Sequence, residues 1–472
     1  MEEFQGYHSE WNLGSPGGWE YQRMTMELGE WCWERIQELT GLDILLDFEH
    51  TILNPRDGFV DLMLSVHKRG YGSSGKRPFI VVTAEEATLK VVMENINTVS
   101  YLNGLTGISA ALTAPERIEQ SGDTVTLDGK EITVLFMDFN NDVLLELKKK
   151  HDIGPLLTAV KKGIVVNPRG ADPINSKAVF EAVHKDLRDR FSETTVYRTP
   201  WTRLFRERST TGPQGEDIPD LVEWVRRNWE RVVLKPEKAH SGVGVFVGCV
   251  RGDRDGDIQE ALERNDYVVQ EVVHLDLWAE EFPWLDHERK EVVLKKWQTD
   301  FRCMMTERGL IGFLGRFGGI PTNVGSGGGT HGIAILHSPI SVREAVDRIN
   351  EAILGLGYAT LKEIQEEGEQ KAVRMGLVYT KGPIRTLLRP RVITMQHLEG
   401  LEEYVNNIWQ DSITLERLWR EGALDHLVHL TAEERELALL QPWEGSPALF
   451  ASDGLFSFGA HVGEWCLRAP SC

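Results

Sequence analysis

The sequence predicts an α/β fold with α+β character, and three observations support this. Short β-branched runs alternate with helical segments between Arg77 and Val166, as in a small open α/β layer. Strand-like runs then dominate from Val232 to Gly318, and helical periodicity dominates after His331. We therefore expect four regions: an N-terminal helical segment at 1–75, a small open α/β domain at 76–175, a strand-rich region at 176–335, and a mostly helical region at 336–472.

Composition narrows the class of protein before any motif is considered. The chain has 472 residues, 41% of them hydrophobic and 26% charged, which is ordinary for a globular protein with two or three cores. A net charge of −20 argues against a nucleic-acid partner. The five scattered cysteines form no CxxC pair, and no window approaches 18 apolar residues. The start of the chain lacks the apolar core of a secretory signal. We expect a cytoplasmic protein without a membrane partner.

The first half of the chain is expected to alternate helices and strands. Apolar spacing predicts a helix over "WEYQRMTMELGEWCWERIQEL", and "GFVDLMLSV" has the composition of a strand. In the small domain we expect, in order, a strand in "PFIVV", a helix at 87–105, strands in "ISAAL" and "EITVLFM", a helix at 142–163 and a strand in "IVVNP".

The second half begins with a predicted helix at 175–191 and the polar loop "RERSTTGPQGEDIP". Strands are expected in "VVLKP", "YVVQEVV" and the long run from Val292 to Gly319. Two capping boxes mark later helices: Ser341 with Glu344, and Thr431 with Glu434.

Two motifs with a chemical interpretation are set aside. "GYGSSGKR" has the glycine and lysine spacing of a phosphate loop, but Arg77 replaces the required hydroxyl and Pro78 opens a strand rather than a helix. We interpret it as a surface loop. His426 and His429 have the i,i+3 spacing of a helical metal pair, but no third ligand is in view, so a surface or core pair is favoured.

Four features in the strand-rich region follow one another in an informative order. Lys177 begins a predicted helix, and Lys235 ends a strand before the glycine-bearing loop "EKAHSGVG". The strand "YVVQEVV" then ends near Gln270 and Glu271. Finally, "DFRCMM" and "GRFGGIPTNVGSGGG" supply Asp300, Arg302, Arg316, Asn323 and a run of glycines. Lysine and arginine suit phosphate oxygens, and glycine lets backbone amides approach an anion.

This order, over roughly Asn167 to His331, resembles the ATP-grasp superfamily of ATP-dependent ligases. The resemblance implies an ATP-grasp fold with a small α/β substrate domain and a nucleotide-binding region at 176–335. It implies ATP and Mg²⁺ as cofactors. The residues implied to contact the nucleotide are Lys177, Lys235, His240, Ser241, Gly242, Gly244, Gln270, Glu271, Val273 and Asp276. Arg302, Arg316 and Asn323 are implied as catalytic residues around the γ-phosphate and acyl group.

The family's magnesium ligands usually include an E-x-N motif after the glycine-rich segment, and no strand with that motif follows His331. "EGLEEYVNNIW" has the letters but is expected to be a helix. A circular permutation resembling glutathionylspermidine synthase and eukaryotic glutathione synthetase would place the metal segment near the N-terminus. Asp61 and either Asp43 or Asp47 would then be ligands, together with Asp300, although Met63 stands where the asparagine is expected. Asp138 with Asn140 is a further alternative.

The resemblance implies an ATP-dependent carboxylate–amine, or carboxylate–thiol, ligase that forms its bond through an acylphosphate. Its partners would be a small-molecule carboxylic acid and an amine, amino acid or peptide, and a homo-oligomer remains an open alternative to a monomer. The rival interpretation is a nucleotide-binding homologue without catalysis that acts as a partner or regulatory subunit. Met63 at an expected ligand position favours that rival.

Overall fold

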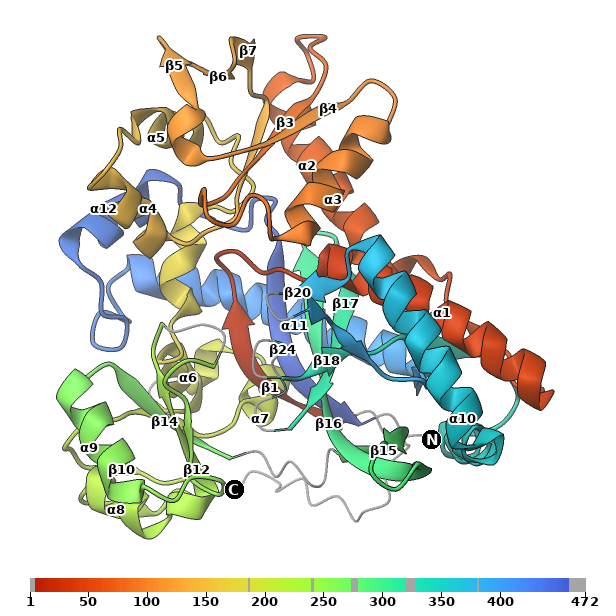
Figure 1. Cartoon of the computed structure of the whole chain (residues 1–472). Helices are drawn as coiled ribbons and strands as arrows, with labels where there is room; N and C mark the ends of the chain where they lie inside the picture. The colour runs from red at the N-terminus through yellow and green to blue at the C-terminus, as the bar shows by residue number, and fades with distance from the viewer. Residues whose placement is uncertain are drawn as a thin grey trace.

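The computed structural model describes residues 5–185, 187–238, 242–272, 279–319, 322, 324, 327–379 and 382–457. Its centre is a seven-stranded sheet in the order β1–β24–β16–β17–β18–β22, with β15 paired to β16 (Figure 1). The first and last strands along the described chain, β1 and β24, are antiparallel neighbours. The strand bounds are Gln5–Asn12 for β1, Phe450–Ser457 for β24, Glu291–Thr306 for β16, Gly309–Gly318 for β17, Gly329–Thr330 for β18, Arg385–Thr386 for β22 and Ala279–Asp286 for β15.

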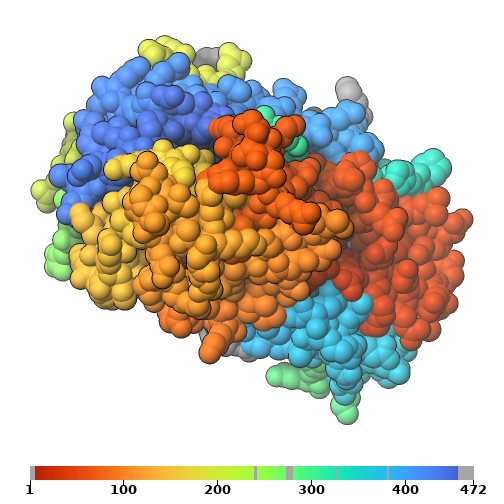
Figure 2. All heavy atoms as spheres, turned by 90° about the horizontal axis from the view of Figure 1, so that it is seen from above, coloured from red at the N-terminus to blue at the C-terminus, as the bar shows by residue number. Residues whose placement is uncertain are grey.

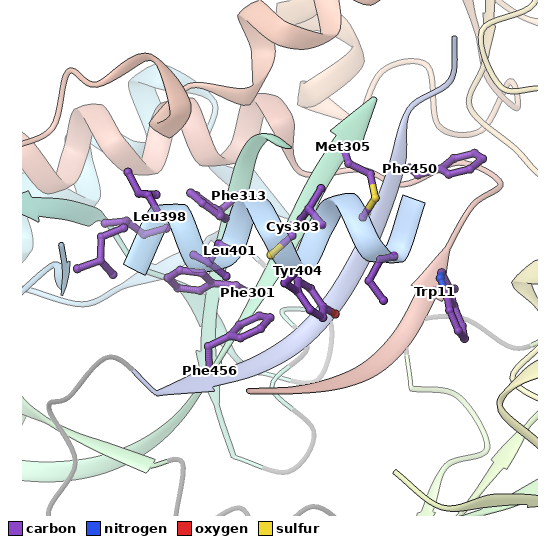
Figure 3. Close-up of a cluster of buried hydrophobic side chains, with 14 of the residues drawn as sticks. Trp11, Phe301, Cys303, Met305, Phe313, Leu398, Leu401, Tyr404, Phe450 and Phe456 are labelled. Carbon is purple, nitrogen blue, oxygen red and sulfur yellow. The ribbon is translucent and has the colours of Figure 1, made fainter. Parts of the chain in front are cut away.

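One face of this sheet packs on helix α11 (Met395–Arg420) and forms the largest core. Alternation along β16 places every second side chain on this face, namely Phe301, Cys303 and Met305, all of them fully buried. They face the apolar side of α11 (Figure 3). The alternate residues Asp300 and Arg302 must point to the opposite face. The core residues labelled in Figure 3 also include Trp11, Phe313, Leu398, Leu401, Tyr404, Phe450 and Phe456.

The small domain is a parallel three-stranded sheet in the order β4–β3–β8, and the predicted α/β layer is confirmed. It covers the top of the molecule between the N-terminal helices and the C-terminal region (Figure 2). Its elements are β3 Phe79–Thr83, α3 Met93–Gly104, β4 Ser109–Thr113, β8 Val134–Met137, α4 Asn141–Lys148 and α5 Gly154–Lys161. A separate three-stranded antiparallel sheet is formed by β5 Glu119–Ser121, β6 Thr124–Leu127 and β7 Lys130–Glu131.

A second lobe, at the lower left of Figure 1, is an antiparallel sheet in the order β13–β12–β14–β9 packed on two helices. Its elements are β9 Thr202–Leu204, α8 Leu221–Arg227, β12 Val232–Pro236, β13 Phe246–Val247, α9 Arg254–Arg264 and β14 Tyr267–Glu271. The expected strands "VVLKP" and "YVVQEVV" are therefore present and hydrogen-bonded to each other.

Long helices complete the fold. α1 (Trp19–Thr40) packs beside α10 (Val342–Met375), whose backbone breaks from helical geometry at Gly357. α12 (Ala432–Leu440) has both hydrogen bonds of the predicted Thr431–Glu434 capping box, and Ser341 caps α10 by accepting the N–H of Glu344. The remaining elements are α6 Val179–His184, α7 Glu193–Arg198, β2 Leu46–Asp47, β10 Thr210–Thr211, β11 Asp217–Ile218, β19 Ile333–Leu336, β20 Val378–Tyr379, β21 Gly382–Pro383 and β23 Arg391–Ile393, with short 3-10 turns between some of them.

Several predicted elements differ from the structure. The single helix predicted at 142–163 is divided into α4 and α5. The run "GFVDLMLSV" lies inside helix α2 (Pro55–Tyr71), with Pro55 at a first-turn position where proline favours helix. "IVVNP" forms only a single bridge, between Val165 and Leu135. The helix predicted at 175–191 shortens to α6, which begins after Lys177.

Candidate functional site

A pocket of about 690 Å³ lies between the central sheet, the small domain and the β12–β14 lobe. Four cationic side chains from separate parts of the sequence line it: Lys177, Lys235, Arg302 and Arg316. Three carboxylates lie among them: Glu10, Asp300 and Asp453. Because the sheet's opposite face is filled by α11, this pocket face is the one free to meet a ligand.

The charges of both lysines act on Glu10. Lys177 Nζ is 2.8 Å from a carboxylate oxygen of Glu10. Lys235 Nζ donates to Gln270 Oε1 at 2.7 Å, and Gln270 is itself fixed by Thr202. Burial lowers the pKa of Lys235 to about 8, although Glu10 opposes this shift. Burial alone would raise the pKa of Glu10, but Lys177 and Lys235 keep it below its ordinary value.

The two arginines form an alternating charge row on strands β16, β17 and β24. Arg302 makes a bidentate pair with Asp453 at 2.8 and 2.9 Å. Arg316 makes a bidentate pair with Asp300 at 2.8 Å and also reaches Asp453 at 2.9 Å. Thr322 donates its hydroxyl to Asp300 at 2.6 Å. Burial would raise the pKa of Asp453, but the two guanidinium groups hold it well below its usual range.

This pairing orients the arginines without exhausting them. A guanidinium has five N–H donors. In the described structure Arg302 directs three of its donors to Asp453 and the carbonyl of Gly17. Within the described structure, the hydrogen bonds of Arg316 use its Nε and Nη2, which leaves its Nη1 group for a ligand in the pocket. Each arginine can therefore hold an anion while its carboxylate partner fixes its orientation.

Strand β1 carries an E-x-N sequence into the same pocket. Glu10 and Asn12 alternate with the buried Trp11, so both face the pocket side. Glu10 stands directly opposite Asp453 in the β1–β24 register, which puts the two carboxylates side by side. The amide nitrogen of Asn12 is buried and has no hydrogen-bond partner within the described chain.

These oxygen donors suit a magnesium ion. Mg²⁺ binds through one or two carboxylates together with other oxygen ligands, and Glu10, Asp453 and the amide of Asn12 supply that set. The assignment of the two amide atoms is a choice, so the unpartnered end of Asn12 can equally present its oxygen. Within the described residues, no group of three or more His, Cys, Asp or Glu side chains could hold a metal by itself. A magnesium site here therefore requires Asn12 as a ligand beside the two carboxylates.

The small domain gives the pocket a wall of opposite charge. Glu85 follows β3, Asp138 follows β8, and Glu94 and Asp142 begin the next helices. All four line the pocket at the carboxyl ends of the parallel strands, where ligands bind in open α/β sheets. Burial raises the pKa of Glu94 to about 8, although the N–H groups of Gly18 and Glu20 oppose the shift.

The structure brings together only part of the predicted site. Of the predicted residues, those that line the pocket are Lys177, Lys235, Gly242, Asp300, Arg302 and Arg316. Gln270 contacts Lys235 from behind, whereas Glu271 and Gly244 do not line the pocket. The backbone of Gly244 adopts a positive φ of 71° and its carbonyl accepts the hydroxyl of Tyr267. His240, Ser241, Val273, Asp276 and Asn323 lie outside the described residues.

The predicted metal segment is corrected by the structure. Asp61 lies on helix α2 instead of a strand and is exposed near Arg308. Asp47 binds the backbone of Glu49 and His50 and is not a pocket residue. Met63 is fully buried in the core between α2 and the small domain, so its identity carries no information about a metal. Asp138 and Asn140 do line the pocket, at the small-domain wall.

The two motifs set aside in the sequence lie outside this pocket. Lys76 of the glycine-rich loop pairs with Glu131 at the surface. His429 pairs with Glu237 at 3.2 Å.

Sequence reasoning missed Glu10, Asn12 and Asp453. The signal for the first two was available, because "SEWN" is an E-x-N motif in a segment with alternating burial. Asp453 had no such signal, since its role depends on pairing with strands far away in the sequence.

Comparison with known proteins gives little further identification. No family model matches the chain, and no curated protein matches its sequence. Three solved structures are similar to parts of it. A RimK-domain ATP-grasp protein from Sphaerobacter thermophilus shares 14% identity, over 45% of this chain and 70% of its own, at a TM-score of 0.26. D-alanyl-alanine synthetase A from Vibrio cholerae shares 11% sequence identity, over 47% of this chain and 68% of its own, at a TM-score of 0.25. A protein described as a gamma-glutamylcysteine synthetase from Methylobacillus flagellatus shares 11% sequence identity, over 66% of this chain and 87% of its own, at a TM-score of 0.27. Likeness at this level carries no argument about function, so the pocket itself must supply it.

Across the described residues, no helix combines the length and the apolar character needed to cross a lipid bilayer.

Proposed function

We propose that the protein is an ATP- and Mg²⁺-dependent ligase of ATP-grasp type, joining a carboxylic acid to an amine or thiol. The observation that carries this proposal is the convergence of Lys177, Lys235, Arg302 and Arg316 on one pocket, facing the strand ends of a small α/β domain. A triphosphate needs several fixed cations, and an acyl substrate needs a second wall beside them.

The residues divide into two roles by their position. Lys177 and Lys235 lie where the β12–β14 lobe meets strand β1, and they would neutralise the triphosphate. Arg302 and Arg316 lie on the central sheet and would hold the transferring phosphoryl group through their remaining N–H donors. Such chemistry depends on position and charge, so no side-chain nucleophile is required.

Magnesium would be held by Glu10, Asn12 and Asp453. When bound, the ion supplies charge neutralisation between the phosphates. Glu10 must then exchange part of its contact with Lys177 for the metal, which releases that lysine toward the nucleotide. Asp453 keeps Arg302 oriented through its other oxygen.

The reaction we propose has two steps. A carboxylate oxygen of the acid attacks the γ-phosphorus, the bond to the β-phosphate oxygen breaks, and ADP leaves. The amine or thiol then attacks the acyl carbon, the bond to the phosphate oxygen breaks, and the proton of the nucleophile passes to the departing phosphate. Gly242 and Val245, which precede β13, line the pocket and would shield that side of the acylphosphate from water.

ADP release measured against a panel of acids and amines tests this proposal. Sustained ADP release should require both, because the acid alone can form at most one acylphosphate per active site. Lys235→Ala should reduce turnover by about 100-fold or more, because it removes a buried phosphate contact. Lys76→Ala is the matched control, since Lys76 is exposed and pairs with Glu131 away from the pocket. Equal turnover of the two variants would contradict the phosphate role. ATP binding without ADP or AMP would favour the non-catalytic homologue, and AMP formation would contradict the acylphosphate.

A further inference from the structure

Glu94 is a buried carboxylate whose contacts lie in another part of the fold. It begins helix α3 of the small domain and is only 4% exposed. Its two oxygens accept the N–H of Gly18 at 2.9 and 3.0 Å, and one of them also accepts the N–H of Glu20 at 3.0 Å. These N–H groups belong to the start of α1, so Glu94 occupies the anion-binding end of that helix.

The segment Ser15–Gly18 joins β1 to α1, and the small domain holds it at several points. Ser15 donates its hydroxyl to Asp138 at 2.9 Å, and Asn95 of α3 donates to the other oxygen of Asp138 at 2.7 Å. A Cβ at Gly17 would lie 2.8 Å from the Glu94 carboxylate, so only glycine permits this close approach. The position of the turn is therefore set by α3 and by the end of β8.

The other side of the same turn contacts Arg302, which belongs to the charge row on β16, β17 and β24. The carbonyl of Gly17 accepts a hydrogen bond from Arg302 Nη1 at 3.2 Å. Gly18, next to it, packs against Met304 and Leu314, the neighbours of this row on β16 and β17. A shift of the turn must therefore move the hydrogen bond from Arg302 Nη1 to the Gly17 carbonyl, while Asp453 holds Nε and Nη2 of the guanidinium.

We propose that Glu94 is a positioning residue, which sets the guanidinium of Arg302 through the Ser15–Gly18 turn and so couples the small domain to the phosphoryl-transfer site. This inference rests on the proposed function, because it gives Arg302 a role in the reaction. In the described structure the side-chain hydrogen bonds of Glu94 go to Gly18 and Glu20, and not to the residues proposed to hold magnesium. Its effect should appear in the rate of the chemical step rather than in nucleotide affinity, which Lys177 and Lys235 provide.

The electrostatics of the site make this coupling sensitive to pH. Burial raises the pKa of Glu94 to about 8, and the charged groups that face it add to the shift: Asp138 from the end of β8 and Glu20 from α1. Tyr21 of α1 also lies nearby and stays protonated, since burial and Glu94 both raise its pKa. A protonated carboxyl has fewer acceptor sites for the two N–H groups. The turn should thus be held best above pH about 8.

The test is kcat at saturating ATP across pH about 6.5 to 9.5 in the wild type, Glu94→Gln and Glu86→Gln. Wild-type kcat should rise through pH about 8. E94Q should lose this rise and fall about tenfold in kcat, with KM for ATP within about twofold, because small misplacements of a reacting group are costly. Glu86 is exposed and outside the pocket, so E86Q should match the wild type. A flat wild-type profile, or an E94Q defect confined to KM, would overturn the proposal.

A double-mutant cycle with Arg302→Gln tests the route of the effect. If Glu94 acts through Arg302, adding E94Q to R302Q should change kcat by less than about twofold. Fully additive losses would overturn the coupling. A purely structural role is distinguished by melting: the folded protein binds the Glu94 proton more tightly than the unfolded chain, so E94Q should melt no lower than the wild type at about pH 9.

Hydrogen exchange separates failure of this inference from failure of the proposed function. The peptide Ser15–Glu20 should exchange faster in E94Q than in E86Q at one fixed pH, whether or not the protein turns over. An unchanged exchange rate would show that Glu94 does not hold the Ser15–Gly18 turn, even in an active enzyme. Faster exchange in a protein that never forms ADP would contradict the proposed ligase activity and still support the contact between Glu94 and the turn.

Discussion

At the scale of single residues, the pocket shows why a buried lysine needs neighbours. Burial disfavours the ammonium of Lys235, while Glu10 restores part of its charge and Gln270 fixes its direction. The positive charge of Lys177 lowers the pKa of Lys235 further. The result is a pKa of about 8, close enough to neutrality that the charge of Lys235 depends on pH and on what occupies the pocket.

This balance predicts a pH dependence of nucleotide binding. Lys235 is charged below pH about 8 and loses its proton as the pH rises through that value. A bound triphosphate favours the charged form, so the affinity for a non-hydrolysable ATP analogue should fall by up to about tenfold per pH unit above 8. Titration calorimetry from pH about 7 to 9.5 measures this. Lys235→Arg should bind with a flat profile, because arginine stays charged; the same decline in that variant would exclude Lys235 as its origin.

Residue types explain which part of the site the sequence predicted. Lys177, Lys235, Arg302 and Arg316 belong to motifs with recognisable local order, and all four reach the pocket. Asp453 could not be found in that way. Its environment is made by β1 and β16, and the hydroxyl of Ser9, which bonds the Asp453 carbonyl, comes from the opposite end of the chain. No local pattern encodes such a pairing.

At the scale of elements, the same alternation that builds the core also builds the site. β16 and β24 place apolar residues toward α11, β1 packs Trp11 on Phe180 of α6, and all three strands place charged residues toward the pocket. Helix α2 shows the limit of such patterns, because "GFVDLMLSV" fits two periods. Phe59, Leu62, Met63 and Val66 are buried at helical spacing, and the proline at the start of the helix decides between them.

The turn that enters α1 should tolerate no side chain at Gly18. Its φ is 125°, and a Cβ would come within 2.7 Å of Leu314 and 2.8 Å of Met304. Gly18→Ala should therefore lower the free energy of unfolding by about 2–3 kcal/mol, from backbone strain and overpacking. Gly355→Ala is the matched control: Gly355 lies in α10 with open space around its Cα, so alanine there should be neutral or stabilise by up to about 1 kcal/mol. Urea unfolding midpoints compare the two, and equal midpoints would contradict the strain.

At the scale of the whole molecule, the two ends of the described chain meet. β1 and β24 are antiparallel neighbours, with Gln5 opposite Ser457 and Glu10 opposite Asp453. Joining the ends would place the E-x-N strand after the glycine-rich segment at 327–329, which is the common order in the family that the sequence resembles. The two carboxylates that meet in the pocket, Glu10 and Asp453, therefore come from strands at opposite ends of the described chain.

This topology predicts that the protein tolerates circular permutation. A variant with a short linker between its ends, and new ends at Gly122–Asp123, keeps β1 beside β24 and interrupts only the exposed turn between β5 and β6. It should fold and bind nucleotide as the parent does. With an ATP analogue at about 100-fold its Kd, both proteins should gain about 2.7 kcal/mol, visible as a rise in melting temperature.

Deleting residues 1–12 is the contrasting variant. It removes Glu10 and Asn12 from the pocket, uncovers the edge of β24 and leaves Asp453 without its neighbour. That variant should lose the ligand-induced rise in melting temperature together with much of its stability. The permutant preserves the pairing of β1 with β24, and the deletion destroys it. If the deletion variant kept the ligand-induced rise in melting temperature while the folded permutant lost it, the E-x-N strand would have no part in the nucleotide site.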